Sequence, residues 1–306
     1  MYDVRSVARS KSGRYPMNSI DIIDGDDYNP HECVDRLRSA MQHPNLDQLV
    51  LSEIEMDANV IKSLLDLLRS GRKWEALYIH FCNGDLAAAI KSILALANVG
   101  KIEIAGNLTY QCIETLSTAL TQNSSLVELA LLVKLNQDNV NMLIQGVIQS
   151  RGLRTLKFIK TTLEAGSIEP LERFLKSDHR LEGISFDRCV AADNDIATLV
   201  NALQDHAVLT DLCIGADLCN VPLQRAISNM LSQNRLLQLT LRNSIQRAQD
   251  VSINTAWIVP SMKVNGSLKI VDLSENSIDD AAFECLVEVF CTNTCLEEVR
   301  LHENRI

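Results

Sequence analysis

Aromatic residues are scarce in this chain of 306 residues: Phe, Trp and Tyr together make up 4%, whereas hydrophobic residues make up 46%. An apolar core with so few rings must be filled by Leu, Ile, Val and Ala. Such filling favours many thin, similar layers over one large globular nucleus. The composition therefore directs attention to internal repeats.

An excess of positive charge is missing too. The formal net charge is −10, whereas proteins that bind nucleic acid usually turn a basic face towards the phosphates. No apolar stretch approaches the roughly 20 residues that a membrane-spanning helix needs. The segment Met1–Pro16 also lacks the apolar stretch of a secretory signal. We therefore expect neither a nucleic-acid partner nor a membrane partner.

Motifs for catalysis and for metal or cofactor binding are absent from the sequence. The nine cysteines include no CxxC pair, and without a secretory signal they are interpreted as reduced thiols of a cytoplasmic or nuclear protein. There is no GxxxxGK[ST] or GxGxxG loop to hold phosphates. His31-Glu-Cys33 resembles one part of a zinc-deaminase signature, but the second part does not follow it. We expect no catalytic residue, no cofactor and no metal.

One pattern does recur from end to end, with apolar residues at positions 1, 4 and 6 of a unit. The first members of successive units lie 25 to 32 residues apart, mostly 27 or 28, which chance does not produce. A degenerate copy, Met17-Ile20-Ile22, comes first. The ten clear copies are Leu46-Leu49-Leu51, Trp74-Leu77-Ile79, Val99-Ile102-Ile104, Leu126-Leu129-Leu131, Leu153-Leu156-Phe158, Leu181-Ile184-Phe186, Leu209-Leu212-Ile214, Leu236-Leu239-Leu241, Leu268-Val271-Leu273 and Leu296-Val299-Leu301.

Each unit has the pattern of a strand, a loop and a helix. The alternation at positions 4 and 6 places two side chains on one face of a strand. A short polar loop follows, and then apolar residues at helical spacing, such as Ile61, Leu64, Leu65 and Leu68. A polar residue, such as Asn123, returns the chain to the next strand. One unit is too thin to bury its apolar face alone, so neighbouring units must bury it jointly.

Position 9 of several units carries Asn or Cys. Such a side chain can satisfy backbone groups of the loop that would otherwise be buried and unpaired. We expect this structural role, rather than redox or metal chemistry, for Cys82 and Cys189. The same position holds Asn107, Asn276 and Asn304.

Some places depart from the regular pattern. The unit that begins at Leu236 carries an insertion near Arg242–Ser252, which either contacts a partner from the rim or is a tolerated insertion. Pro260 lies within the helical stretch of the same unit, where it should kink or restart the helix. His179 and His206 hold equivalent places near the ends of their units, where we expect them to be exposed.

The two last units resemble the ribonuclease-inhibitor-like class of leucine-rich repeats, through Leu268-Lys-Ile-Val-Asp-Leu-Ser-Glu-Asn276 and Leu296-Glu-Glu-Val-Arg-Leu-His-Glu-Asn304. The resemblance implies an α/β solenoid, a right-handed β/α horseshoe with parallel strands inside and helices outside. It covers residues 17–306, which we expect to form a single domain of about 11 repeats. The last repeat is expected to be truncated at Ile306, and residues 1–16 to be a disordered basic tail.

The function of this class is not decided by its fold. Its members include inhibitors of secreted nucleases, activators of the Ran GTPase, actin-capping tropomodulins and the sensor ends of immune receptors. We expect a monomeric, non-enzymatic scaffold or regulatory module that binds a protein partner on its concave face. The alternatives are a Ran-type GTPase-activating protein and the sensor region of a larger immune-type receptor.

Positions 3, 5 and 7 of each unit should point away from the core, onto the concave face. In the middle units these positions are unusually apolar and are flanked by positive charge, as is typical of interaction sites. A competing interpretation is that Phe81, Leu132 and Val133 pack under a neighbouring loop as a satellite core. The later units carry polar residues there, such as Asp187 and Arg242. The predicted partner-binding residues are Tyr78, His80, Phe81, Leu132, Lys157 and Ile159.

Overall fold

The computed structural model describes residues 19–23, 30–42, 45–70, 73–96, 98–164, 166–177, 180–192, 194–243 and 255–306. The chain divides into two compact units. Unit 1 comprises Met1–Lys134 and Asp138–Leu153, and unit 2 comprises Leu135–Gln137 and Arg154–Ile306. The predicted basic tail and most of the insertion near Arg242–Ser252 lie outside the described residues.

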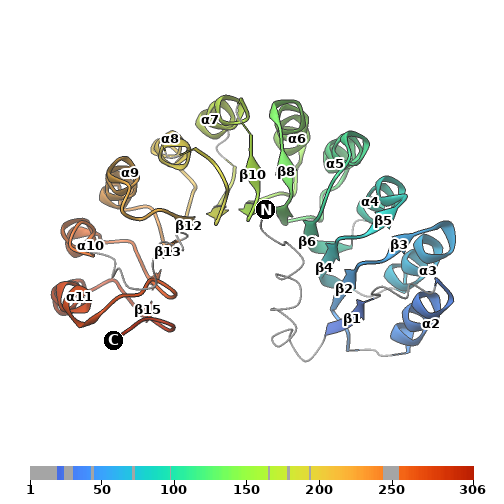
Figure 1. Ribbon diagram of the computed structural model, residues 1–306, viewed down its shortest axis with the longest axis horizontal. Helices are drawn as coiled ribbons and strands as arrows, with labels where there is room; N and C mark the ends of the chain where they lie inside the picture. The colour runs from blue at the N-terminus through green and yellow to red at the C-terminus, as the bar shows by residue number, and fades with distance from the viewer. Residues whose placement is uncertain are drawn as a thin grey trace. The chain divides into compact units, whose positions relative to one another are not determined.

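Unit 1 is a sheet of parallel strands that alternate with helices, all of which lie on one side of the strands (Figure 1). Its strands, in spatial order, are β1 (Ser19–Ile23), β2 (Gln48–Ser52), β4 (Trp74–His80), β6 (Val99–Ala105) and β7 (Glu128–Leu132). Two shorter strands, β3 (Glu55–Met56) and β5 (Asn83–Gly84), pair with each other in the loops. The helices are α2 (Pro30–Met41), α3 (Ala58–Leu68), α4 (Leu86–Ala95), α5 (Tyr110–Gln122) and α6 (Gln137–Gln149), the last beginning at the boundary with unit 2.

Unit 2 repeats the same alternation. Its parallel strands, in spatial order, are β9 (Thr155–Ile159), β11 (Gly183–Asp187), β12 (Asp211–Ala216), β13 (Gln238–Asn243), β14 (Ile270–Asp272) and β15 (Glu298–Arg300). The short strand β10 (Thr162–Leu163) belongs to a loop, and so does β8 (Lys134–Leu135), of which Lys134 is assigned to unit 1. The helices are α7 (Ile168–Ser177), α8 (Asp195–Ala202), α9 (Val221–Ser232), α10 (Val259–Val264) and α11 (Asp280–Thr292).

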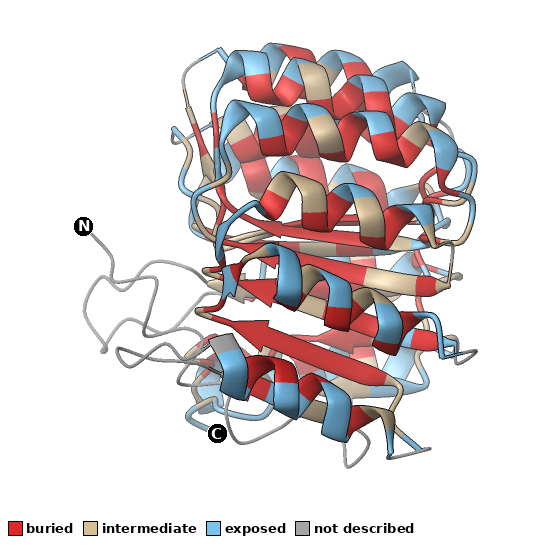
Figure 2. Ribbon diagram, turned by 90° about the vertical axis from the view of Figure 1, so that its right-hand side faces the viewer, coloured by how far each residue is buried: buried red, intermediate tan, exposed pale blue. Residues whose placement is uncertain are grey.

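The strand register confirms the repeat that was derived from spacing. Leu49 of β2 lies opposite Leu77 of β4, and Leu212 of β12 lies opposite Leu239 of β13, so position 4 meets position 4. The degenerate first copy obeys the same rule, because Ile20 lies opposite Leu49. Figure 2 shows the consequence: buried residues line the helix sides that face the strands, and exposed residues line the outer sides.

Acidic and amide side chains begin many of the helices. The Asp57 carboxylate accepts hydrogen bonds from the backbone amides of Asn59 and Val60, at 2.7 and 2.8 Å, at the start of α3. Asn220 and Asp279 do the same for α9 and α11. Each such cap satisfies amides that have no partner within the helix. These residues therefore mark where the loop ends in their own repeats.

The position-9 residues form the predicted structural ladder. The Cys82 and Cys189 thiols donate to the carbonyl oxygens of Leu51 and Phe158, at 3.6 and 3.4 Å. Asn276 donates in the same way to Leu241, at 2.7 Å. In each case the acceptor is the position-6 carbonyl of the preceding unit. Asn107, at the same position, is exposed instead.

A second ladder lies where each helix returns to the next strand, three residues before position 1. The side-chain amide of Asn123 donates to the Leu94 carbonyl at 2.6 Å, and its oxygen accepts from the Leu126 amide at 2.7 Å. Asn265 makes the corresponding contacts in unit 2. His206 occupies the equivalent place and is only 2% exposed, so the prediction that it is exposed was wrong. This position lies where the end of a helix meets the next turn, inside the stack of repeats, and a residue placed there is therefore buried. His179 lies outside the described residues.

Pro260 restarts the helix of its unit rather than kinking it. Helix α10 begins at Val259 and carries the proline in its first turn. Proline is tolerated there, because a first-turn amide has no partner within the helix.

Candidate protein-binding faces

In each of the two compact units, the face of the sheet that carries repeat positions 3, 5 and 7 is the strand face. In unit 1 most of this face is buried. Only Tyr78, Lys101 and Glu128 keep intermediate exposure among these positions of β2, β4, β6 and β7. The buried members are Gln48, Val50, Ser52, Ala76, His80, Glu103, Ala105, Ala130 and Leu132.

Tyr78 is the aromatic side chain of this face, and its ring is held from two directions. The His80 ring meets it edge-on, with centroids 6.0 Å apart and an interplanar angle of 82°. The Lys101 ammonium lies 5.6 Å from the centre of the Tyr78 ring, which is within the range of a cation–π contact. Burial raises the pKa of the Tyr78 phenol, which is therefore neutral near pH 7.

Acidic partners hold the two groups that flank Tyr78. His80 Nε2 lies 3.1 Å from Glu103 Oε1, and both side chains are 5% exposed. Lys101 Nζ lies 2.9 Å from Glu128 Oε1. Burial disfavours the charged form of Lys101, but Glu128 outweighs it and raises the Lys101 pKa. His80 and Lys101, each paired with a carboxylate, thus hold the Tyr78 ring and restrict its movement.

Phe81 follows β4 at position 8 and has left-handed backbone, with φ of 54°. Its amide donates to the Ala105 carbonyl at 2.8 Å, so the strand ladder continues past the strand. The next unit has Gly106 at this position, where an added Cβ would lie 3.3 Å from the Phe81 Cα. The glycine therefore gives the Phe81 backbone room. Phe81 itself keeps intermediate exposure.

The predicted site residues divide between the two units. Tyr78 and Phe81 of unit 1 are partly exposed, and so are Lys157 and Ile159 on β9 of unit 2. The expectation that His80 and Leu132 are exposed was wrong, because they are 4% and 5% exposed. His80 packs between Tyr78 and Glu103. Val133 is also buried, at 4%, as the competing interpretation expects for Leu132 and Val133, whereas Phe81 is not buried.

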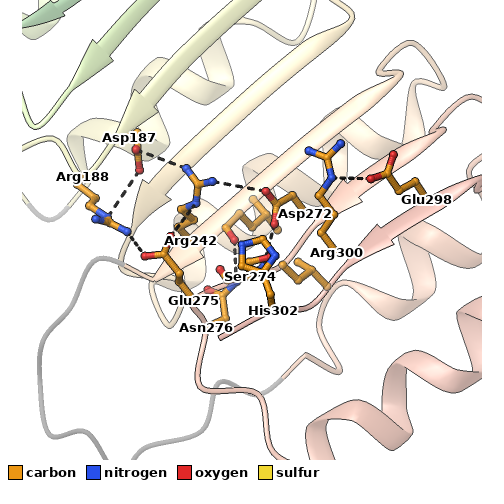
Figure 3. A network of polar contacts seen from close by, with 12 residues as sticks. Asp187, Arg188, Arg242, Asp272, Ser274, Glu275, Asn276, Glu298, Arg300 and His302 are labelled. Atoms are coloured by element: carbon orange, nitrogen blue, oxygen red, sulfur yellow. Dashed lines mark hydrogen bonds and ion pairs between the residues drawn. The ribbon is translucent and has the colours of Figure 1, made fainter. Parts of the chain in front are cut away.

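The strand face of unit 2 is more open and carries an ion-pair network, shown in Figure 3. The Arg242 guanidinium lies among three carboxylates, 3.6 Å from Asp187, 3.5 Å from Asp272 and 3.8 Å from Glu275. Arg188 pairs with Glu275 from the other side. Asp187 and Arg242 were both predicted to lie on this face, but not to contact each other. The signal in the sequence was that Asp187 and Arg242 carry opposite charges at position 7 of two repeats, while the repeat between them has Gly215 at the same position.

Gly215 makes the contact between Asp187 and Arg242 possible. The three residues occupy one row across β11, β12 and β13. A Cβ at Gly215 would lie 2.4 Å from Asp187 Oδ1 and 2.6 Å from the backbone nitrogen of Arg188, and real Cβ atoms essentially never come so close. The missing side chain therefore leaves the space that the Asp187 carboxylate occupies.

Asp272 connects the network to the last strand. Burial works against its charge, but hydrogen bonds from Ser274 and the nearby Arg242 outweigh this and hold the Asp272 pKa below its ordinary value. The Ser274 amide donates to Asp272 at 3.0 Å, and the Ser274 hydroxyl lies 2.8 Å from His302 Nδ1. Although Asp, Ser and His meet here, Ser274 is fully buried, so its hydroxyl is inaccessible to a substrate.

Three of the thiols are held in their protonated form. Burial raises the pKa of Cys82 to about 12 and raises that of Cys189 and, on the strand face of unit 2, Cys213. A thiol must lose its proton to act as a nucleophile. Within the described residues, no group of three or more His, Cys, Asp and Glu side chains could hold a metal ion. No described helix is long and apolar enough to span a membrane.

The repeated strand–loop–helix unit, the parallel register and the position-9 ladder define the chain as an α/β protein with the leucine-rich-repeat fold. No protein-family model matches the sequence, and neither does any curated protein.

Solved structures with a similar fold include a protein from Bacteroides fragilis, with 14% identity and a TM-score of 0.49 over 88% of this chain and 78% of that one. Rad7, solved in complex with Elc1 in yeast, has 15% identity and a TM-score of 0.49 over 88% of this chain and 66% of its own. TLR13, solved with an ssRNA, has 16% identity and a TM-score of 0.43 over 85% of this chain and 36% of its own. At these identities the likeness concerns the fold alone.

Proposed function

We propose that this chain is a non-enzymatic protein-binding module, in which the strand face of unit 1 contacts a protein partner through Tyr78. The observation that carries the proposal is the half-buried Tyr78 ring, held between the His80 ring and the Lys101 ammonium. An aromatic side chain that is already fixed loses little freedom on binding and offers a large contact area. Such residues provide much of the binding energy in protein interfaces.

The other predicted residues take different parts in this proposal. Phe81 provides a second aromatic contact at the end of β4. His80 and Leu132 are buried and therefore position the surface rather than touch the partner. Lys157 and Ile159, which are partly exposed on β9, are proposed as partner contacts of unit 2 by itself. We also propose a ribonuclease-inhibitor-like repeat and a cytoplasmic location, which the nine free cysteines support.

The proposal is tested by replacing one aromatic ring at a time. Tyr78→Ala removes the anchor, whereas Tyr110→Ala removes a tyrosine that is 58% exposed at the start of α5 in the same unit. Partners are first recovered with the wild-type chain from cells of its source, and their affinity is then measured with purified proteins. We expect Tyr78→Ala to weaken binding by roughly 30-fold or more, the effect of losing an interface hot spot.

Tyr110→Ala is expected to leave the affinity unchanged, and thermal unfolding shows whether each variant remains folded. A partner that binds folded Tyr78→Ala as tightly as wild type would remove Tyr78, and with it this face, from the proposed function.

A further inference from the structure

The strand face of unit 2 has a charge pattern that indicates the chemistry of its partner. In the repeats of β11 to β15, the charged groups at positions 3, 5, 7 and 8 are six carboxylates and three guanidinium groups, a net charge of −3 with His302 neutral, whereas the repeat of β9, at the other end of this sheet, carries Lys157 and Lys160. The carboxylates are those of Asp187, Asp211, Asp272, Glu275, Glu298 and Glu303, and the guanidinium groups are those of Arg188, Arg242 and Arg300.

All three guanidinium groups are already engaged by carboxylates of the same face. Arg242 lies among Asp187, Asp272 and Glu275, and Arg188 pairs with Glu275. Arg300 Nε lies 2.6 Å from Glu298 Oε1, with both side chains more than 40% exposed. In the repeats of β11 to β15 the carboxylates outnumber the guanidinium groups that they hold, so this part of the face favours a cationic over an anionic partner.

Two exposed acids of this face stand in one row. Asp211 of β12 lies opposite Gln238 of β13, which lies opposite Ile270 of β14, which lies opposite Glu298 of β15. Asp211 and Glu298 are exposed, and Gln238 and Ile270 keep intermediate exposure. Within the described part of the chain, no cationic side chain pairs with Asp211, which accepts a hydrogen bond from Thr210 at 2.6 Å.

The spacing of this row matches an extended peptide. Asp211 and Glu298 are three strand steps apart, roughly 14 Å at about 4.8 Å per step. Four residues of extended chain span about 13 Å, and residues i, i+2 and i+4 point to the same side. A segment lying across the strands can therefore place one side chain at each end of the row and one between Gln238 and Ile270.

We propose that the strand face of unit 2 binds an extended protein segment with Lys or Arg at two positions four residues apart and an apolar residue midway between them. The basic residues pair with Asp211 and Glu298, and the apolar residue packs between Gln238 and Ile270, against the Ile270 side chain. The exposed pair between Glu298 and Arg300 exchanges readily, because such pairs are worth little in water. This inference rests on the proposed protein-binding function but concerns a different unit and different residues.

The test uses short labelled peptides and the full chain. The probe Ser-Lys-Ser-Leu-Ser-Lys-Ser has the proposed spacing, whereas Ser-Lys-Lys-Leu-Ser-Ser-Ser has the same composition with adjacent lysines. Fluorescence anisotropy at low salt measures the affinity of each peptide. We expect the spaced peptide to bind at least about fivefold more tightly, because only it can pair with both acids at once.

Paired variants then locate the site. Asp211→Asn with Glu298→Gln removes the two proposed contacts, and Asp205→Asn with Glu284→Gln removes the same charge from exposed positions away from the strand face of unit 2. We expect the first double variant to lose the preference for the spaced peptide and the second to keep it. Equal binding of the two peptides by wild type, absence of binding, or equal loss in both double variants would each overturn the inference. Tyr78→Ala should leave peptide binding unchanged, so either proposal can fail without the other.

Discussion

The two units place very different chemistry on the same positions of the same repeat. In unit 1 the strand face is mostly buried, and the side chains of its pair His80 and Glu103 are each 5% exposed. In unit 2 the strand face is more open, and its charges form a network around Arg242 with pair distances of 3.5 to 3.8 Å. The repeat therefore determines the backbone and the core, whereas the side chains at the same positions of neighbouring repeats determine what each face can bind.

The largest difference between the units should appear when their polar pairs are broken. His80→Leu removes the imidazole that lies 3.1 Å from the buried Glu103 carboxyl and puts an apolar side chain in its place. Breaking such a pair costs about 3–5 kcal/mol. We expect a loss of stability of that order in denaturant unfolding.

The double variant His80→Leu with Glu103→Leu is the matched control for this prediction. Because both polar groups are then removed together, most of the lost stability should return. If the single variant unfolds at the wild-type denaturant concentration, the pair does not support the Tyr78 ring in the way described here.

The next effect concerns the space that the network of unit 2 requires. Gly215→Ala adds a methyl group that would lie 2.4 Å from Asp187 Oδ1 and 2.6 Å from the Arg188 nitrogen. Overpacking of this kind typically costs about 1–3 kcal/mol. Gly266→Ala serves as the control, because the nearest atom to its added methyl group is 3.9 Å away. The two variants should differ in unfolding free energy by about that amount, and equal stabilities would show that Gly215 is not needed for space.

The smallest effect is the pH dependence that Asp272 introduces. Its folded-state pKa is below the ordinary value of 3.8, so its charge stabilises the fold at pH values above 3.8. That contribution disappears as the pH falls through the lower, folded-state pKa. Wild type should therefore lose stability over this acidic range more steeply than Asp272→Asn does. Parallel curves of unfolding free energy against pH would contradict the assignment.

The backbone and core of this molecule could be predicted from the sequence, because they repeat. Leu49 and Leu77 occupy the same position of consecutive units, so their meeting across β2 and β4 follows from spacing alone. The roles of Cys82 and Asn276 followed for the same reason, since a loop that recurs must satisfy the same carbonyl each time.

The candidate sites were less predictable, because they depend on side chains of different units. The burial of His80 depends on Tyr78 of its own strand and Glu103 of the next. The burial of His206 depends on its sharing a row with Asn123 and Asn265, which spacing could have revealed. The network around Arg242 depends on the small size of Gly215, which no periodic pattern of apolar residues records.

The most direct test of the central claim is a contact map by site-specific photo-crosslinking. A photo-reactive phenylalanine analogue is introduced at Phe81 in one variant and at Tyr110 in another, so that the probe lies on the strand face or at the helix side of the same unit. With the partner present, we predict a crosslinked product from position 81, lost when Tyr78→Ala is added, and little product from position 110. Crosslinking from position 110 alone would contradict the account, because it would place the partner on the helices rather than on the strand face.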